Sequence, residues 1–437
     1  MAMKEESKKL FIQTLGCQMN STDTMHIMAE LKEHKNYDVT TKMEDADLII
    51  INTCSVREKP VQKLFSEIGQ FNVKKKAGAK IGVAGCTASH LGKDIIKRAP
   101  YVDFVLGARN ISKISEVVDK KGSVEIDINN DESTYEFAEY KVSQFRTAVN
   151  ISVGCDKECT YCIVPATRGE EISIPPDMII NEINKAVENG AVEVSLLGQN
   201  VNSYGRKFSD GRGKYSFTEL LRDISKIPKI KRIRFTSPHP LHMDDEFIEE
   251  FASNDKISKC IHMPLQSGST DILKIMKRGY SKKWFLNRAA KIKDLVPNVR
   301  ITTDIIVGFP GESDEDFADT IDVMNQVKFD QVFNFKYSPR PNTAAENMTN
   351  IVPNEIASKR LVEVIELSKV QMDEHMRSKV GTIMEVLFED LKPNGEIAGF
   401  TDNYCQVFVK GSDELLGKFV KVKIISNSRT SLKGELL

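Results

Sequence analysis

Three cysteines of this chain each stand at the end of a short apolar run, and this placement constrains the fold more than any other feature of the sequence. Cys17 follows LFIQTLG, Cys54 follows LIIINT and Cys86 follows IGVAG. Segments with helical periodicity lie between the runs, and strands that alternate with helices predict a parallel, doubly wound sheet. Because ligands of such sheets gather at the carboxyl ends of the strands, we expect the three thiols to meet there despite their distance in sequence.

A second set of cysteines is compact. Cys155, Cys159 and Cys162 follow the apolar run AVNISVG with the spacing C-x3-C-x2-C. Thiolates in this arrangement suit iron–sulfur clusters, and a cluster held by three of them keeps one iron free to bind something else. The alternative, a structural zinc site, needs a fourth protein ligand. None is adjacent, since the nearest histidine in sequence, His90, lies in another predicted domain.

Composition indicates a soluble protein of several domains. The 437 residues suggest about three domains at roughly 150 residues each, and 41% hydrophobic with 28% charged residues is normal for a globular chain. No apolar run is long enough for a membrane span, and the N-terminus lacks a secretory signal. We therefore expect a cytoplasmic, reducing location, where clustered cysteines favour metal binding over disulfides. The formal net charge of −1 argues against a purely electrostatic nucleic-acid binder.

The order of apolar runs divides the chain into three domains. Residues 8–120 predict the N-terminal doubly wound parallel sheet, and the polar residues 121–146 predict a linker. Residues 147–370 contain six strand-like runs with helical segments between most of them, which predicts a central partial (β/α)6 barrel with its chemistry at the carboxyl ends of the strands. Residues 374–437 carry short β-type runs that predict a small all-β barrel.

The compact cysteine motif is that of the radical S-adenosylmethionine (SAM) superfamily, and almost the whole chain resembles its methylthiotransferase family. That family joins a three-cysteine domain, a radical SAM barrel and a small, OB-like RNA-binding TRAM domain. GCQMN and NTCSVRE resemble the branch that modifies isopentenyl-adenosine in tRNA, whereas GCKVN or NTCGF marks the sister branches. Departures from the branch pattern are GCTAS, Ser152 and Ala166, and none removes a cysteine.

The resemblance implies two [4Fe-4S] clusters and SAM as cofactors. Cys155, Cys159 and Cys162 would hold the radical SAM cluster, and Cys17, Cys54 and Cys86 the auxiliary one. The implied reaction adds a methylthio group to carbon 2 of N6-isopentenyladenosine-37 in the tRNA anticodon loop. One SAM is the methyl donor, and a second gives the 5′-deoxyadenosyl radical, since no side-chain base removes an unactivated hydrogen. Catalytic residues beyond the clusters are not identified.

Other polar groups at strand ends are expected to line the site. Tyr161 matches the aromatic position that the family places near the adenine of SAM, and Gly198 and Gln199 lie where the second strand would approach its methionine moiety. Further residues expected to line SAM or substrate are Ser237, Gln266, Arg278 and Asp304. We expect Cys260 and Cys405, which stand outside both sets, to be buried structural thiols.

The resemblance also implies partners. The tRNA anticodon stem-loop is the expected substrate, and the basic residues of 410–433 and of the loop 204–215 are candidates for phosphate contacts. We further expect an electron donor such as flavodoxin or ferredoxin, proteins that supply sulfur or clusters, and no membrane.

Two alternatives stay open at this point. A sister branch would act on threonylcarbamoyl-adenosine or on an aspartate of a ribosomal protein. A non-enzymatic iron–sulfur scaffold or electron carrier is an alternative of another class, and it leaves the six-strand barrel and the RNA-type β-barrel unexplained.

Overall fold

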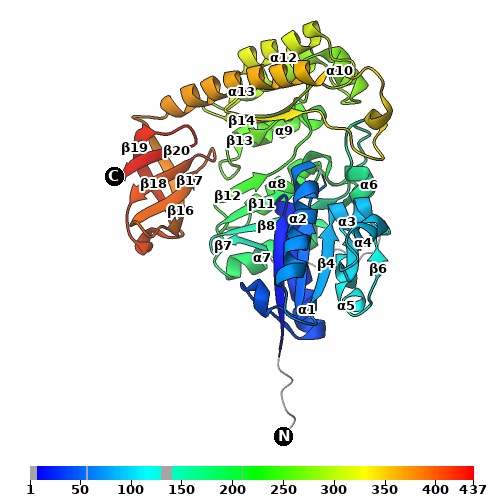
Figure 1. Ribbon diagram of the computed structural model, residues 1–437. Coiled ribbons are helices and arrows are strands. Elements are labelled where there is room, and N and C mark those ends of the chain that lie inside the picture. The colour runs from blue at the N-terminus through cyan, green and yellow to red at the C-terminus, as the bar shows by residue number, and fades with distance from the viewer. Residues whose placement is uncertain (1–6, 56–57, 129–139, 209) are drawn as a thin grey trace.

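The computed structural model describes residues 7–55, 58–128, 140–208 and 210–437. They form three bodies in chain order: an α/β domain, an open barrel of strands and helices, and a small β-barrel (Figure 1). Within these ranges, no helix combines the length and the apolar character that crossing a membrane requires.

The N-terminal domain is a parallel sheet with the strand order β2-β1-β3-β4-β5-β6. One hydrophobic cluster covers each of its two faces, as expected for a doubly wound domain. The strands are β1 (Lys8–Leu15), β2 (Tyr37–Val39), β3 (Leu48–Thr53), β4 (Lys80–Gly85), β5 (Phe104–Gly107) and β6 (Ser123–Glu125). The helices are α1 (Gln18–Lys35), α2 (Glu58–Lys74), α3 (Cys86–Leu91), α4 (Lys93–Arg98) and α5 (Ile114–Val117).

The range 121–146, expected as a linker, begins and ends in strands. β6 is the edge strand of the N-terminal sheet. β7 (Tyr140–Ser143) pairs antiparallel with the first barrel strand, so each end of this range extends a neighbouring sheet. The acidic stretch 129–139 lies outside the described residues.

The central domain contains all six predicted strands, arranged in two sheets. The first sheet has the order β12-β11-β8-β7 and the second the order β13-β14-β15. An isolated bridge joins Ile233 of β12 to Ile257, which precedes β13, and no strand pairing links the two sheets within the described residues, so the barrel is partial, as predicted. The six strands are β8 (Arg146–Asn150), β11 (Glu193–Leu197), β12 (Arg232–Phe235), β13 (Cys260–His262), β14 (Arg300–Val307) and β15 (Gln331–Lys336).

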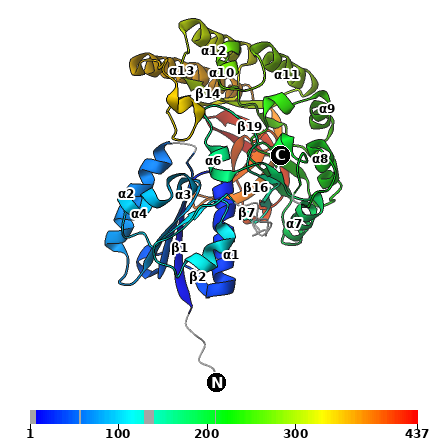
Figure 2. The same cartoon turned by 90° about the vertical axis from the view of Figure 1, so that its right-hand side faces the viewer.

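Helices cover the outside of this barrel (Figure 2). They are α7 (Pro176–Glu188), α8 (Phe217–Ser225), α9 (Asp245–Ser253), α10 (Thr270–Ile275), α11 (Lys282–Leu295), α12 (Asp314–Val327) and α13 (Asn354–Arg377). The short helix α6 (Val164–Arg168) lies instead beside α3 of the N-terminal domain. A short antiparallel pair, β9 (Ser152–Val153) and β10 (Ile172–Ser173), flanks the loop that carries the compact cysteines.

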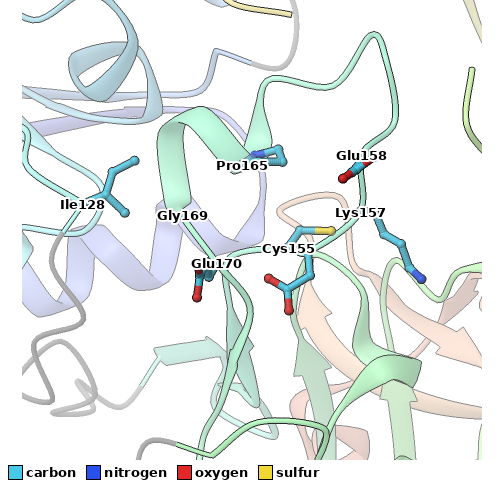
Figure 3. A pocket seen from close by; sticks show the side chains of 8 residues that line it. Ile128, Cys155, Lys157, Glu158, Pro165, Gly169 and Glu170 are labelled. Carbon is cyan, nitrogen blue, oxygen red and sulfur yellow. The ribbon is translucent and has the colours of Figure 1, made fainter. Parts of the chain in front are cut away.

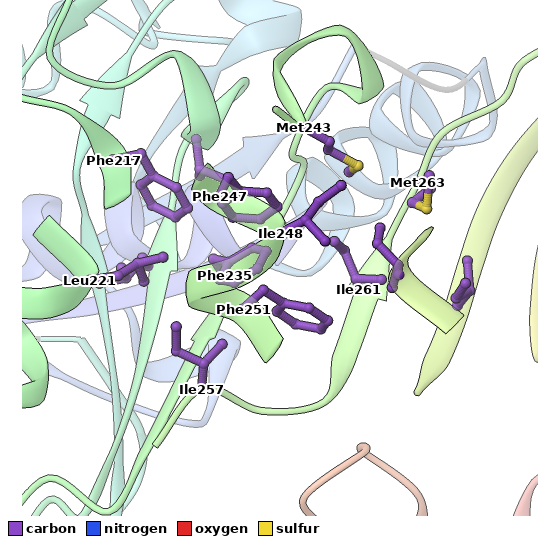
Figure 4. Packing of buried hydrophobic residues seen from close by; sticks show 14 of the residues in the cluster. Phe217, Leu221, Phe235, Met243, Phe247, Ile248, Phe251, Ile257, Ile261 and Met263 are labelled. Carbon is purple, nitrogen blue, oxygen red and sulfur yellow. The ribbon is translucent and has the colours of Figure 1, made fainter. Parts of the chain in front are cut away.

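Alternate residues of each barrel strand face opposite ways. Phe235, Ile261 and Met263 pack into the hydrophobic core beneath the helices (Figure 4). Their strand neighbours Arg234 and His262 are polar and face the lumen, the space that the strands enclose. The barrel therefore has an apolar outer layer and a polar interior, which is the arrangement of a ligand-binding barrel.

The C-terminal domain is a closed five-stranded barrel of order β16-β17-β18-β20-β19. Its strands are β16 (Ile383–Leu391), β17 (Glu396–Thr401), β18 (Gln406–Lys410), β19 (Phe419–Asn427) and β20 (Ser431–Leu436). The turn between β17 and β18 docks under the central barrel. Arg232 Nη1 donates to the carbonyl of Phe400 at 3.1 Å, and Arg234 Nη2 to that of Thr401 at 3.0 Å.

Candidate active site

The compact cysteines lie in a loop shaped by backbone contacts. Gly154, with φ +82°, turns the chain directly before Cys155, whose amide donates to the carbonyl of Gly169 at 3.0 Å. The Cys162 amide donates to the Cys159 carbonyl at 2.9 Å, which folds the C-x2-C half into a turn. Burial raises the pKa of the Cys155 thiol to about 12 and that of Cys162 to about 11. Such thiols ionise when a bound cation compensates their negative charge.

The dispersed cysteines stand at the carboxyl ends of adjacent strands. Cys17 follows β1 at the start of α1, Cys54 follows β3, and Cys86 follows β4 as the first residue of α3. β3 lies between β1 and β4 in the sheet. A hydrogen bond with the Cys54 side chain and the charge of Arg168 lower the pKa of Cys17 to about 6. Burial, in contrast, raises the pKa of the Cys86 thiol. The structure thus brings these three residues to the carboxyl ends of adjacent strands, with thiolate character favoured at Cys17.

Arg168 joins the two cysteine sets. It ends α6, which follows the compact loop and lies beside α3 (Figures 1 and 2). Its Nε donates to Cys86 Sγ at 3.2 Å, and its Nη2 to Asp23 Oδ2 at 2.6 Å. Both charged side chains of this ion pair are buried. From the sequence, Arg168 is a charged residue shortly after Cys162 that could pair with the nearby Glu170 or Glu171, whereas the structure pairs it with Asp23.

Several buried polar atoms above the barrel strands have no hydrogen-bond partner among the residues that the structure describes. They come from the ends of β8 and β11 and from the loop after β12: Asn150 Oδ1, Ser152 Oγ, Gln199 Oε1, both amide atoms of Asn200, and Nε2 of His239. An unpaired buried polar group costs about 1–3 kcal/mol. Their gathering at one end of the barrel is therefore the signature of a site for a polar ligand.

Two residues predicted from sequence connect this polar region to the compact loop. Arg278 Nη1 donates to Cys159 Sγ at 3.3 Å, and Arg278 Nε to the hydroxyl of Tyr280 at 3.1 Å. The ring of His239 lies 5.7 Å from that of Tyr280. Tyr161, between the second and third compact cysteines, packs edge-on against Phe309 at 6.4 Å. Arg278 therefore contacts the cysteine loop from outside, and Tyr161 anchors the loop against Phe309.

The remaining predicted residues occupy distinct places. Gly198 lies so close to β9 that a side-chain Cβ would come within 2.7 Å of Ser152 Oγ. Gln199 Nε2 donates to the sulfur of Met19, which belongs to the N-terminal domain. Ser237 and Gln266 adopt positive φ angles of 56° and 69° in the loops after their strands. Asp304 points into the lumen, where its carboxylate contacts His262.

The two basic stretches differ in how far their positive charges are paired with carboxylates of the protein. In the loop 204–215, Lys207 pairs with Glu170, and Arg212 pairs with Asp177 and Asp210. Residue 209 of this loop lies outside the described residues. In the C-terminal barrel, lysines at the start of β19, along β19 and on β20 are exposed: Lys418, Lys421, Lys423 and Lys433. The C-terminal stretch is thus the more accessible cationic surface.

A cavity of about 490 Å³ opens beside the compact loop (Figure 3). Its lining residues are Ile128, Cys155, Asp156, Lys157, Glu158, Pro165, Gly169 and Glu170. Among the described residues, no three His, Cys, Asp or Glu side chains are grouped as ligands of a single metal ion, and this holds for both cysteine sets as well as for the zinc alternative.

Comparison with known proteins identifies the family. The model of the Uncharacterized protein family UPF0004 matches residues 9–107, the Radical SAM superfamily matches 149–324, and the TRAM domain matches 377–437. The tRNA-2-methylthio-N(6)-dimethylallyladenosine synthase of Aliarcobacter butzleri is 72% identical over 432 residues, which are 99% of both chains. The chain belongs to the family of tRNA-2-methylthio-N(6)-dimethylallyladenosine synthases. The synthase of a Nitratiruptor species, 60% identical over 98% of this chain and 99% of its own, agrees.

Solved structures show the same fold at low identity. The radical S-adenosylmethionine methyltransferase TsrM from Kitasatospora setae, with tryptophan substrate and a SAM analogue bound, aligns with a TM-score of 0.57 at 11% identity, over 78% of this chain and 75% of TsrM. Membership in the synthase family confirms the resemblance stated from the sequence. It excludes the two alternatives, a sister branch of the family and a non-enzymatic electron carrier.

Proposed function

We propose that this chain transfers a methylthio group to carbon 2 of N6-dimethylallyl-adenosine at position 37 of the tRNA anticodon loop. Its class, a radical SAM methylthiotransferase that acts on tRNA, follows from the family. The observation that carries the proposal is the junction at Arg168, where the arginine that follows the compact cysteines contacts Cys86 of the dispersed set. A reaction that needs a radical source and a sulfur source requires such neighbouring sites.

Two [4Fe-4S] clusters and SAM are the cofactors of this family. We assign Cys155, Cys159 and Cys162 to the radical SAM cluster, and Cys17, Cys54 and Cys86 to the auxiliary cluster. The donor sets fit, because each offers three thiols and each lies beside a buried arginine whose charge favours thiolates. When bound, these groups supply the radical that removes the carbon-2 hydrogen, together with the methyl group and the sulfur.

The chain itself binds and orients the reactants. Unpartnered polar atoms of Ser152, Asn200 and His239 are suited to the amino-acid and ribose groups of SAM. Tyr161 belongs to an apolar cluster with Ile306 and Phe309 that suits a purine ring. Polar groups at one end and apolar groups at the other match the two ends of SAM.

The exposed lysines of the C-terminal barrel are suited to contact tRNA phosphates, which position an RNA without reading its sequence. The target base then leaves its stack to reach the barrel, as is general for enzymes that act on bases. An electron donor such as flavodoxin or ferredoxin, and proteins that supply sulfur or clusters, stay predictions of the sequence.

Two single-cysteine variants of the full-length, reconstituted enzyme test the assignment. Cys159→Ala is expected to abolish 5′-deoxyadenosine formation from SAM. Cys54→Ala is expected to keep that product and to lose the methylthiolated nucleoside, both measured by mass spectrometry. Cys405→Ala, at a buried thiol of the C-terminal barrel, is the control. Retained methylthiolation in Cys54→Ala contradicts the two-cluster assignment, and nucleoside analysis of tRNA from cells that lack the protein tests the substrate independently.

A further inference from the structure

Four side chains at two successive levels of the lumen belong neither to the cysteine sets nor to the unpartnered polar atoms above the strands. They are His262 on β13, Thr302 and Asp304 on β14, and Phe333 on β15. The strand register places His262 opposite Thr302 and Asp304 opposite Phe333. We refer to these four residues as the lumen patch.

Direct contacts hold the polar part of the lumen patch in place. The Nδ1 atom of His262 lies 2.9 Å from Thr302 Oγ1, and its Nε2 lies 3.2 Å from Asp304 Oδ2. The ring of Phe333 meets the imidazole edge-on at 6.0 Å. These contacts fix the imidazole between a hydroxyl and a carboxylate, with an aromatic ring against it.

Three residues of the lumen patch are accessible, and Thr302 is buried. The side chains of His262 and Asp304 are 23% and 27% exposed. Phe333 is 37% exposed, whereas its neighbour Val332 on the helix-facing side is buried in the main core. Packing of the hydrophobic core does not explain why an accessible aromatic ring lies beside a carboxylate inside the barrel.

Neighbouring domains close the other boundaries of the lumen. At the bottom, Arg234 stacks on Tyr404 of the C-terminal barrel at 4.3 Å and donates to Ser258 Oγ at 2.6 Å. Along β8 and β11, Met19 of the N-terminal domain packs with Ala148 and Leu197. The wall with accessible side chains is therefore the one built by β13, β14 and β15.

We propose that the lumen patch is the subsite that holds the target adenine base. Exposed aromatic rings stack on unpaired bases, and each such stack contributes a large share of the affinity. An ionised carboxylate accepts hydrogen bonds on both oxygens, so Asp304 can bond His262 and the N6–H of the base together. Phe335, the next lumen-facing residue of β15, lies opposite Ile306 and offers apolar surface to an alkyl group on N6. This inference rests on the function proposed above.

Binding of two stem-loop RNAs to the reconstituted full-length enzyme tests the subsite. The RNAs carry either N6-dimethylallyl-adenosine or plain adenosine at the target position, and fluorescence anisotropy gives both affinities. The wild-type enzyme is expected to prefer the alkylated loop. Phe333→Ala is expected to weaken binding of that loop about tenfold, the effect of losing one base–aromatic stack, and Asp304→Asn to reduce the preference as well.

Controls separate the subsite from a general loss of structure. Lys336→Ala lies on the same strand, is exposed and contacts Asn354 of α13, so it is expected to bind both RNAs as the wild type does. Phe333→Tyr keeps the ring and is expected to restore binding, which also shows that the position tolerates substitution. The affinity for SAM alone, measured by equilibrium dialysis, is expected to stay at the wild-type value in Phe333→Ala.

Two results overturn the inference. If Phe333→Ala and Asp304→Asn weaken SAM binding while the preference for the alkylated loop persists, the lumen patch holds the adenine of SAM and not the target base. If both variants bind both RNAs and SAM as the wild type does, the patch holds neither. Failure of the proposed function is a separate result, because the wild-type enzyme would then form no methylthiolated nucleoside at all.

Discussion

At the scale of single residues, Arg168 connects the two halves of the candidate site. Its guanidinium is buried between Asp23 and Cys86, and both partners belong to the N-terminal domain. A buried charge is tolerated where it is paired and hydrogen-bonded. Arginine suits this position better than lysine, because its planar fork donates to two acceptors in fixed directions.

Replacing Arg168 tests this connection. Arg168→Met leaves the carboxylate of Asp23 buried without its partner, which is expected to cost about 3–5 kcal/mol of stability. We also expect loss of methylthio transfer, because Cys86 loses its donor. Denaturant unfolding and product analysis measure the two effects, and Arg168→Lys is expected to be intermediate.

A matched surface pair serves as the control for Arg168. The ion pair of Lys207 with Glu170 is exposed, so Lys207→Met is expected to change stability by less than about 1 kcal/mol. Equal losses of stability in Lys207→Met and Arg168→Met would show that the burial of the Arg168 ion pair does not determine its contribution to stability.

Gly154 is a second residue whose identity the compact loop requires. Its φ is +82°, and a Cβ at this position would lie 1.9 Å from the carbonyl oxygen of Glu170. Gly154→Ala is therefore expected to displace the loop and to lower the iron content of the reconstituted protein to that of Cys155→Ala. Gly395 has a similar φ of +77°, but no atom lies near the position of an added Cβ. Gly395→Ala is therefore expected to lower stability by only about 1–2 kcal/mol and to leave the iron content unchanged.

At the scale of elements, strand positions were predictable where the strand lies within a long apolar run. The four long strands of the N-terminal sheet and the six of the barrel match the predicted runs. β2 and β6 are three residues each, too short for a periodic signal. The helical segment after β4 is divided into α3 and α4 at Gly92, whose φ of +49° interrupts the helical backbone.

The candidate site was predictable only in its cysteines and part of its lining. The strand-end argument places Cys17, Cys54 and Cys86 together, because it depends on topology alone. Arg168 and the contact of His262 with Asp304 depend on how side chains from separate elements meet, and spacing in the sequence carries no information about that.

The long helix α13 provides a prediction at this scale. Arg360 donates to Glu312 Oε2 at 2.7 Å and to the carbonyl of the same residue at 3.0 Å. Glu312 in turn accepts from the Gly308 amide at 2.7 Å, so the pair ties α13 to the loop after β14. The side chain of Glu312 is fully buried, and burial raises its pKa above the ordinary value.

Removing Arg360 is expected to weaken this attachment. Arg360→Met leaves the buried Glu312 carboxyl without its cation, which costs about 3–5 kcal/mol if the carboxyl stays ionised. Thermal unfolding measures the loss, and the neighbouring exposed Lys359→Met is the control. An unchanged midpoint in Arg360→Met would mean that packing of α13, and not this ion pair, holds the loop.

At the scale of the whole molecule, the C-terminal barrel forms the floor of the central barrel. Glu193, at the start of β11, is fully buried and faces three arginines: Arg234 at 2.7 Å, Arg232 at 3.3 Å and Arg146 at 3.8 Å. Arg232 and Arg234 also donate to the backbone carbonyls of Phe400 and Thr401 at the end of β17. The lysines proposed to contact tRNA are thereby held in a fixed position relative to the lumen.

Neutralising the carboxylate at the centre of this cluster tests whether the two barrels act as one body. In Glu193→Gln the buried Arg234 loses its carboxylate partner, whereas Arg146 keeps Glu389 and Arg232 keeps Asp402. This loss is expected to destabilise the interface by about 3–5 kcal/mol. Hydrogen exchange of the β17–β18 turn is then expected to accelerate, while the core of the C-terminal barrel, around Val386 and Val407, keeps its protection. Glu188→Gln, at the exposed end of α7, is the control.

Glu193→Gln is also expected to affect substrate binding. Because the lysines of the C-terminal barrel are no longer held against the lumen in this variant, its tRNA affinity is expected to fall without a change in SAM affinity. Accelerated turn exchange with full tRNA affinity would contradict the fixed-floor arrangement, since it would show that a loosely attached C-terminal barrel serves the substrate equally well.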